Sequence, residues 1–352
     1  MAYTDIDKPT DYFTTFLWTG DGSTSPRTHT GVGLQADMMW SKIRSSGHQH
    51  NLVDTVRGVN QRLLMPSDNN DEDTTCTHGH FDSLDSDGFT TTNAGGNWNV
   101  NTSGETYVGW FWKANGSGSS NSDGNITSTV SANTTSGFSI VSYTGTGSNA
   151  TVGHGLGSTP SMIIAKDRDG ARNWTIYHKS LGATKWLQLD DTSASQTGSP
   201  MWQDTEPTSS LFSIGTYAQI NTSSSKYIAY CFSEVKGFSK FGSYIGNGNA
   251  DGTFVYTGFS PSFVIRKRTD SADSWQMHDN KRDTFNVTYH RLLADDSGSE
   301  YTSTSNQLDF LSNGFKCRAS NGGANGSGGS YIYMAFAENP FVTSTGIPTT
   351  AR

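Results

Sequence analysis

The chain has 352 residues, of which 33% are hydrophobic and only 16% are charged. Its formal net charge is −8 at pH 7, and because no basic patch stands out we expect no binding to nucleic-acid phosphates. No stretch approaches the ~18 consecutive apolar residues that cross a bilayer, so membrane insertion is not expected. The three cysteines are too widely spaced for a disulfide framework, which favours assembly in a cytosol: Cys76, Cys231 and Cys317.

The chain begins with a polar arm, residues 1–11, that is either a docking segment or a frayed terminus. A first repeat follows at 12–113, and it opens with Trp18-Thr-Gly-Asp-Gly22, an aromatic residue followed by a glycine turn. It closes with Tyr107-Val-Gly-Trp-Phe-Trp112, a continuous apolar run. Such a run predicts a strand that is buried on both faces, in the centre of its sheet.

The glycine- and serine-rich segment 114–136 contains no aromatic residue, and its composition predicts a linker. The same order of landmarks then recurs twice, in a second repeat at 137–236 and a third at 237–342, before a polar tail at 343–352. The opening aromatics are Trp18, Tyr143 and Tyr244, and the closing strands contain Tyr107, Tyr227 and Tyr331.

Abundant aromatic and hydroxyl residues with 39 glycines are typical of short strands joined by many turns. We therefore predict an all-β protein of three tandem β-sandwich repeats, each of about 100 residues. An alternative arrangement packs the three units around a pseudo-threefold axis into one body. The first repeat departs from the others, with Ala36 where they have Pro160 and Pro261, and with Asn51 near the place of Trp174 and Trp275.

Several phrases of the sequence resemble those of repeat-bearing virion proteins of tailed bacteriophages, marine ones especially. They are Tyr-x-Gly-x-Gly, Gly258-Phe-Ser-Pro261-Ser-Phe-Val-Ile-Arg-Lys, Ser-Asn-Gly314-Phe, Tyr331-Ile-Tyr-Met-Ala-Phe336 and the opening Met1-Ala-Tyr-Thr-Asp-Ile-Asp-Lys-Pro. The resemblance covers the chain to about residue 342. It implies sandwich domains of the jelly-roll or lectin-like type, as in fibres and head decorations.

The same resemblance implies a non-enzymatic structural protein of the virion, assembled in the host cytoplasm and exposed as a tail-fibre appendage or a head decoration. Its partners would be capsid, tail or adaptor proteins and a host-surface glycan, with a homotrimer as a candidate assembly. Two other hypotheses stay open: an array of carbohydrate-binding modules, and a glycosidase. A glycosidase needs two facing carboxylates, but the pairs Asp190/Asp191 and Asp295/Asp296 recur in two repeats, which predicts that they bind turn amides.

Two groups of residues in the first repeat are candidate metal ligands. His48, His50, His78 and His80 stand at i, i+2 spacing, which places each pair on one face of a strand and suits a transition metal. The acidic stretch 68–73 offers oxygen ligands of the kind that calcium prefers. In each case the alternative is a polar, solvated loop.

The tryptophans are candidates for stacking on sugar rings. Trp174 and Trp275 occupy equivalent places in two repeats, which favours a core position. Trp202 lies in a segment with no counterpart, so it is the leading candidate for a surface contact, with Trp186 as a second.

Overall fold

The computed structural model describes residues 3–60, 62–77, 79–93 and 100–349. Its strands pair in antiparallel ladders, and its helices are single short turns. The prediction of an all-β protein is confirmed. Among the described residues no helix has the length and apolar character that crossing a membrane requires.

The strands form three units, preceded by the 3-10 turn η1 (Pro9–Asp11). Unit 1 (13–112) contains β1 (Phe13–Thr19), β2 (Arg27–Thr30), β3 (Met38–Ile43), β4 (Asn51–Asp54), β5 (His80–Asp85), β6 (Gly88–Thr92) and β7 (Thr106–Trp112). Unit 2 (119–232) contains β8 (Ser119–Asn121), β9 (Ser128–Asn133), β10 (Phe138–Thr144), β11 (Ala150–Gly153), β12 (Met162–Asp167), β13 (Thr175–His178), β14 (Lys185–Gln188), β15 (Gln196–Thr197), α1 (Ser199–Trp202), β16 (Leu211–Ile214), α2 (Ala218–Asn221) and β17 (Lys226–Phe232). Unit 3 (239–340) contains β18 (Ser239–Ile245), β19 (Phe254–Tyr256), β20 (Phe259–Arg268), β21 (Gln276–Asp279), β22 (His290–Leu293), β23 (Tyr301–Thr302), β24 (Leu308–Leu311), β25 (Gly314–Cys317), α3 (Gly322–Asn325) and β26 (Ser330–Pro340).

Each unit is a sandwich of a larger inner sheet and a smaller outer sheet. The inner sheets run β1-β7-β3-β4, β15-β14-β13-β12-β17-β10-β9-β8 and β18-β26-β20-β21-β22-β23. The outer sheets run β2-β6-β5, β11-β16 and β19-β25-β24. A separate apolar cluster fills the space between the two sheets of each unit.

The closing strands β7, β17 and β26 lie inside their inner sheets, as the sequence predicts: β7 lies between β1 and β3, β17 between β10 and β12, and β26 between β18 and β20. Along β7, Tyr107 and Phe111 point into the core of unit 1, whereas Trp110 and Trp112 point the other way, into a second core. Successive side chains of a strand point to opposite faces. The run is apolar throughout because each of its faces is covered by a different core.

The landmark aromatics are cross-strand partners. The opening residue pairs with the closing tyrosine in each unit, and their ring centroids lie 4.8 to 5.2 Å apart in nearly parallel planes. The pairs are Trp18 with Tyr107, Tyr143 with Tyr227, and Tyr244 with Tyr331. The recurring phrase is therefore the strand end where the two rings stack.

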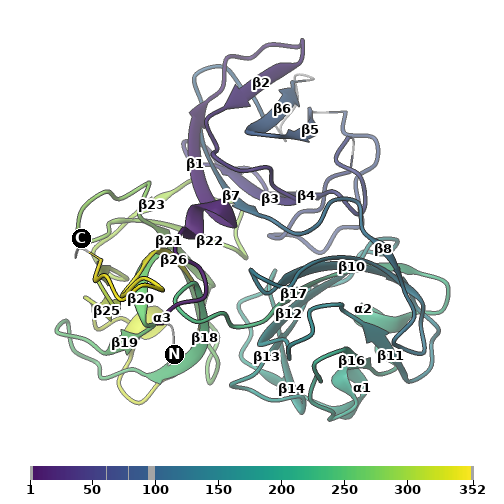
Figure 1. Cartoon of the computed structure of the whole chain (residues 1–352). Helices are drawn as coiled ribbons and strands as arrows, with labels where there is room; N and C mark the ends of the chain where they lie inside the picture. The colour runs from purple at the N-terminus through teal and green to yellow at the C-terminus, as the bar shows by residue number, and fades with distance from the viewer. Residues whose placement is uncertain (1–2, 61, 78, 94–99, 350–352) are drawn as a thin grey trace.

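The three units surround a central core to which all of them contribute (Figure 1). Phe336 on β26 packs there against rings of the other two units, with its centroid 4.8 Å from Phe13, 5.8 Å from Trp112 and 6.1 Å from Phe232. Of the two arrangements compatible with the sequence, the structure has the single body. The units pack together because each closing strand is apolar on both faces, and only one of these faces is covered within its own unit.

The N-terminal arm and the segment between units 1 and 2 are both packed against the body. The segment 114–136 contains β8 and β9, which extend the inner sheet of unit 2, and Ile126 and Val130 are buried there, so the prediction of a linker from composition is wrong. In the arm, Ile6 is buried in the central core and the Asp5 amide donates to the Lys236 carbonyl (3.3 Å). The frayed alternative is therefore wrong for residues 3–11. The first and last described segments of the chain lie beside unit 3 (Figure 1).

Candidate functional site

A loop of each unit lies against the next unit, and we call each such contact a seam. The seams form a closed ring, from unit 1 to unit 2, from unit 2 to unit 3 and from unit 3 back to unit 1. At each seam a backbone amide of the loop donates to a backbone carbonyl of the next unit, at 2.8 to 2.9 Å. The donors and acceptors are Glu72 and Arg168, Ser195 and Thr269, and Glu300 and Arg44.

Two of the seams contain a carboxylate between two arginines. At the seam of units 1 and 2, Glu72 accepts from Arg57 (2.7 Å) of its own unit and from Arg168 (2.8 Å) of the next. Burial raises the pKa of Glu72, but the two guanidinium groups outweigh burial and the pKa lies below its ordinary value. The carboxylate is thus held in its charged, bridging form.

The seam of units 3 and 1 repeats this network. Glu300 accepts from Arg282 (3.0 Å) within unit 3 and from Arg44 (2.8 Å) of unit 1. The corresponding residue at the remaining seam is Ser195, whose hydroxyl donates to the Thr269 carbonyl (3.0 Å). The seam of units 2 and 3 is therefore joined by neutral hydrogen bonds at this place.

A second set of contacts lies nearer the centre, between the strand β4, β13 or β21 of one inner sheet and the closing strand of the next unit. Asp54 accepts from the Tyr230 hydroxyl (2.7 Å), and Asp279 accepts from the Trp110 indole (3.2 Å). His178, at the same position of unit 2, has its Nε2 3.2 Å from the carbonyl of Tyr333. Each aspartate also binds an arginine of its own unit at 2.5 Å, and all four of these side chains are fully buried. The ion pairs are Asp54 with Arg57 and Asp279 with Arg282.

The paired aspartates bind turn amides, as predicted. Asp190 accepts from the amide of Trp174 (3.0 Å) and Asp295 from the amide of Trp275 (2.7 Å). The second aspartate of each pair accepts from a nearby turn amide, Ser193 for Asp191 and Gly298 for Asp296. Burial raises the pKa of Asp190 to about 7. These carboxylates shape the loops that form the seams.

His50, the residue before Asn51, occupies the place that tryptophan holds in the other units. Its Nδ1 accepts from the Trp40 indole (2.9 Å), which leaves Nε2 to donate to the carbonyl of Leu293 (3.0 Å) across the seam. The indoles of Trp174 and Trp275 likewise donate to carbonyls of the neighbouring unit, those of Met65 and Gln188. Both ring nitrogens of His50 are in use, so it is not a metal ligand.

Replacement of His50 by glutamine should flatten the acid dependence of stability. Burial, followed by the charge of Lys42, holds the pKa of His50 well below its ordinary 6.5. Below pH 6.5 the unfolded chain binds a proton at this residue that the folded chain does not, so acid favours unfolding. Urea titrations between pH 6.5 and 5 should show the wild-type free energy of unfolding falling more steeply than that of the variant, with a difference in slope that grows toward about 1.4 kcal/mol per pH unit near pH 5. Parallel curves would contradict this assignment.

The other predicted metal ligands are not gathered into a site by the described residues. His80 has its Nε2 3.1 Å from Asp82, on the same strand, and His78 lies outside the described residues. His48 lies in the stretch before β4. Among the residues that the structure describes, no group of three or more histidine, cysteine, aspartate or glutamate side chains could hold a metal ion.

The acidic stretch 68–73 is ordered by its own contacts. Asp68 accepts from the amide of Asn70 (3.1 Å) and from the side chain of Gln49 (3.0 Å). Asp73 accepts from the amide of Thr75 (2.9 Å). Together with the arginine contacts of Glu72, these bonds make the stretch a seam loop, and among the described residues its acidic side chains do not gather into a group that could hold a metal ion.

Trp186 and Trp202 are core residues, so the prediction that they stack on sugars is wrong. Their side chains are 4% and 2% exposed, and both belong to the apolar cluster between the sheets of unit 2. The loop-like segment around Trp202 forms the turn α1, which places this ring edge-on against Tyr177 at 5.9 Å. The sequence around Trp202 is polar and contains glycine, so it does not predict that this side chain is buried.

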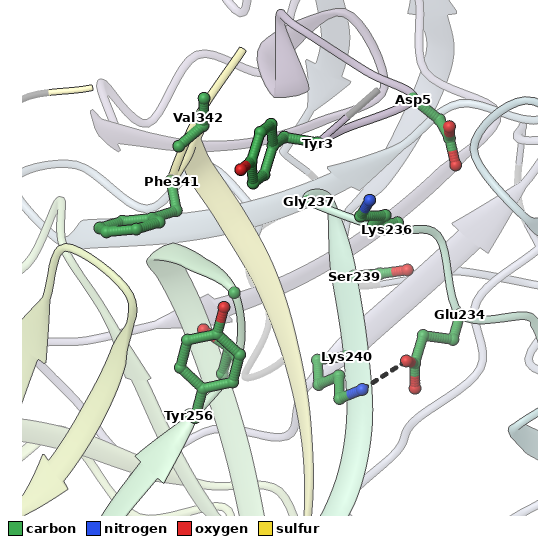
Figure 2. A pocket seen from close by; sticks show the side chains of 12 residues that line it. Tyr3, Asp5, Glu234, Lys236, Gly237, Ser239, Lys240, Tyr256, Phe341 and Val342 are labelled. Atoms are coloured by element: carbon green, nitrogen blue, oxygen red, sulfur yellow. Dashed lines mark hydrogen bonds and ion pairs between the residues drawn. The ribbon is translucent and has the colours of Figure 1, made fainter. Parts of the chain in front are cut away.

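The exposed aromatic residues gather elsewhere. Ten large hydrophobic side chains are exposed among the described residues, and nine of them belong to unit 3 or to the chain ends beside it. Three of these nine, Tyr3 of the arm, Tyr256 of β19 and Phe341 after β26, line one pocket of about 510 Å³ (Figure 2). We call it the terminal pocket. Its size falls within the roughly 300–1,000 Å³ of small-molecule sites.

Charged groups line another part of the terminal pocket. Glu234 accepts from Lys240 (2.5 Å), as Figure 2 shows, and also from Lys179 (2.5 Å). Burial raises the pKa of Glu234, but these two hydrogen bonds outweigh it, and the pKa lies below its ordinary value. The ammonium group of Lys236 lies 5.7 Å from the centroid of the Tyr3 ring, close enough for a cation–π contact.

The arm can form one side of the terminal pocket because residue 237 is glycine. The Thr4 hydroxyl donates to the Lys236 carbonyl (3.1 Å), and a Cβ at position 237 would lie only 2.6 Å from the Cβ of Thr4. Gly237 also has φ of +77°, where side chains are strained. The backbone of the arm therefore passes directly over the connection between units 2 and 3.

The outer strands carry a sequence signal for this pocket, although it is visible only once the three strands are aligned. In unit 3 this strand is β19, whose buried Val255 pairs with Phe315 of β25. The residues on either side of Val255, Phe254 and Tyr256, are exposed. In the equivalent strand of unit 1 the two flanking residues are Thr28 and Thr30, and in unit 2 they are Thr151 and Gly153. Unit 3 thus has two aromatics at positions that are small or polar elsewhere.

Comparisons with known proteins place the chain in a family. Neither the curated proteins nor the solved structures that were compared include a match. Residues 8–340, which span the three units and end at the last residue of β26, match a family model described as a domain of unknown function, DUF7483. The chain therefore belongs to the DUF7483 family.

Proposed function

We propose that this protein is a non-enzymatic structural component of a tailed-bacteriophage particle, exposed on its surface as a tail appendage or head decoration. The proposal begins from the resemblance of its repeated phrases to virion proteins. It assigns unit 3 and the two chain ends to contacts with other molecules, and the remaining units to a rigid support. Capsid, tail or adaptor proteins and the host surface are the partners that this role requires.

A structural role is supported by the contacts of the charged side chains that recur in the units, because these side chains hold the units together. Glu72 and Glu300 each bridge two arginines across a seam, and Asp190 and Asp295 bind the amides that shape the seam loops. Groups of this kind carry acid–base chemistry in a glycosidase. Here their recurrence is explained by the assembly of the body.

The proposal is tested on purified particles of the virus that encodes the chain. Mass spectrometry of washed particles should detect the protein in a fixed ratio to the major capsid protein. Cryo-electron microscopy of the same particles should show a three-unit density on the outer surface. Unit 3 should either contact a neighbouring virion protein or face outward, where a host surface can reach it. Recovery of the protein only in the soluble fraction of the lysate would overturn the proposal.

A further inference from the structure

We infer that the terminal pocket binds a neutral pyranose unit of a glycan. A pyranose has apolar C–H faces and a rim of hydroxyl groups. A site that suits it therefore needs exposed aromatic rings beside charged or polar groups, and it needs to be open enough to admit a segment of a longer chain. The terminal pocket meets each requirement with residues from four separate segments.

The aromatic part is formed by rings that lie in the solvent although they belong to a folded body. Tyr256 is 59% exposed on β19, Tyr3 extends from the arm, and Phe341 follows the end of β26. Figure 2 shows the three rings around the same opening. Exposed aromatic rings that gather at one pocket indicate a contact surface, whereas scattered single ones do not.

The polar part is fixed in place before any ligand binds. Glu234 is held between Lys179 and Lys240, at 2.5 Å from each ammonium nitrogen. A carboxylate flanked by ammonium groups offers an acceptor beside donors, which is the arrangement that adjacent sugar hydroxyls can use, and hydrogen bonds to charged groups are the stronger ones. The pocket lining contains the acids Asp5 and Glu234 as well as two lysines, so its charge is balanced. That balance favours a neutral sugar over an acidic one.

The outer sheet does not need the aromatic side chain that β19 contributes to the pocket. The outer-strand position that carries Tyr256 in unit 3 carries Thr30 in unit 1 and Gly153 in unit 2. An aromatic side chain at this position is therefore not required to build the outer sheet. Large apolar side chains that the fold does not need, and that water contacts, point to a ligand.

The inference rests on the proposed function only for the source of the glycan, and the two can be tested separately. The isolated full-length protein is applied to an array of neutral and uronic-acid oligosaccharides, and the strongest ligand is then titrated calorimetrically. We expect binding to neutral pyranose oligosaccharides. The change Tyr256→Thr, which introduces the residue of unit 1, should weaken the affinity by roughly tenfold or more. Phe341→Ser should weaken it in the same direction.

Phe285→Ser is the matched control, because Phe285 is an 82% exposed aromatic of the same unit and does not line the pocket. This variant should bind as the wild type does, and equal melting temperatures of all variants would exclude unfolding as the cause. The inference is overturned if the wild type binds no neutral glycan, or if both pocket variants keep its affinity. Binding only to acidic glycans, abolished by moderate salt, would also overturn it, since simple charge attraction would then explain the contact. These binding measurements use the isolated protein, so their outcome does not depend on whether the protein is found in virus particles.

Discussion

Replacement of Asp279 by alanine should lower the free energy of unfolding by about 3–5 kcal/mol, since it removes one partner of a buried ion pair and the acceptor of several buried hydrogen bonds. Asp279 binds Arg282 at 2.5 Å, and neither side chain is exposed. Its carboxylate also accepts from the indole of Trp110 in unit 1 and from the amides of Lys281 and Arg282. The substitution therefore leaves Arg282 with Glu300 as its remaining carboxylate partner, and it removes the acceptor of the Trp110 indole and of two backbone amides.

The measurement is a urea titration followed by tryptophan fluorescence. Asp251→Ala is the control, because Asp251 also forms a 2.5 Å ion pair, with Lys316, but its side chain is 77% exposed. Exposed ion pairs contribute little to stability because water and salt screen them, so this variant should be close to the wild type. Equal losses in the two variants would show that burial does not distinguish the pairs, and buried charge could then not explain how the units hold together.

Truncation of Phe336 to alanine has an effect of similar size, about 3–5 kcal/mol, because it opens a cavity where three units meet. The ring touches aromatic residues of units 1 and 2 as well as its own, so each unit loses part of its packing. We expect all regions of the chain to lose protection together in hydrogen exchange. A loss confined to unit 3 would contradict the shared core.

Phe336→Leu is the companion variant. Leucine keeps most of the apolar volume, so its cost should be well below that of alanine, since conservative hydrophobic changes usually cost less than ~1.5 kcal/mol. A loss as large as that of the alanine variant would mean that ring geometry, rather than filled volume, determines stability at the centre.

The fold was predictable because its determinants are local in the sequence. The aromatic residue before each glycine turn and the tyrosine of each closing strand stand out, and they prove to be stacked partners. The apolar run of β7 likewise indicates burial on both faces. It does not say what covers the second face, and this is why separate tandem domains and a single body were both compatible with the sequence.

The candidate site was less predictable, because it depends on contacts between distant segments. Trp202 was expected on the surface because its surroundings are polar, but the turn α1 buries it. His50 was expected to bind a metal because of its spacing from His48, whereas its partners are Trp40 and a carbonyl of unit 3. The terminal pocket joins Tyr3 to Phe341, and no local pattern reports that the two ends of a chain meet.

The closed ring of seams has a consequence for how the units could change over evolutionary time. Each unit presents its loop to the next in the same head-to-tail manner, which is the geometry of a cyclic homotrimer. In such a trimer every substitution would appear in three copies. Here the three units are joined in one polypeptide, so each can acquire its own residues outside the seams. Tyr256 in unit 3, against Thr30 in unit 1, is an example of such a difference: it places an exposed aromatic side chain at a position that is polar in unit 1.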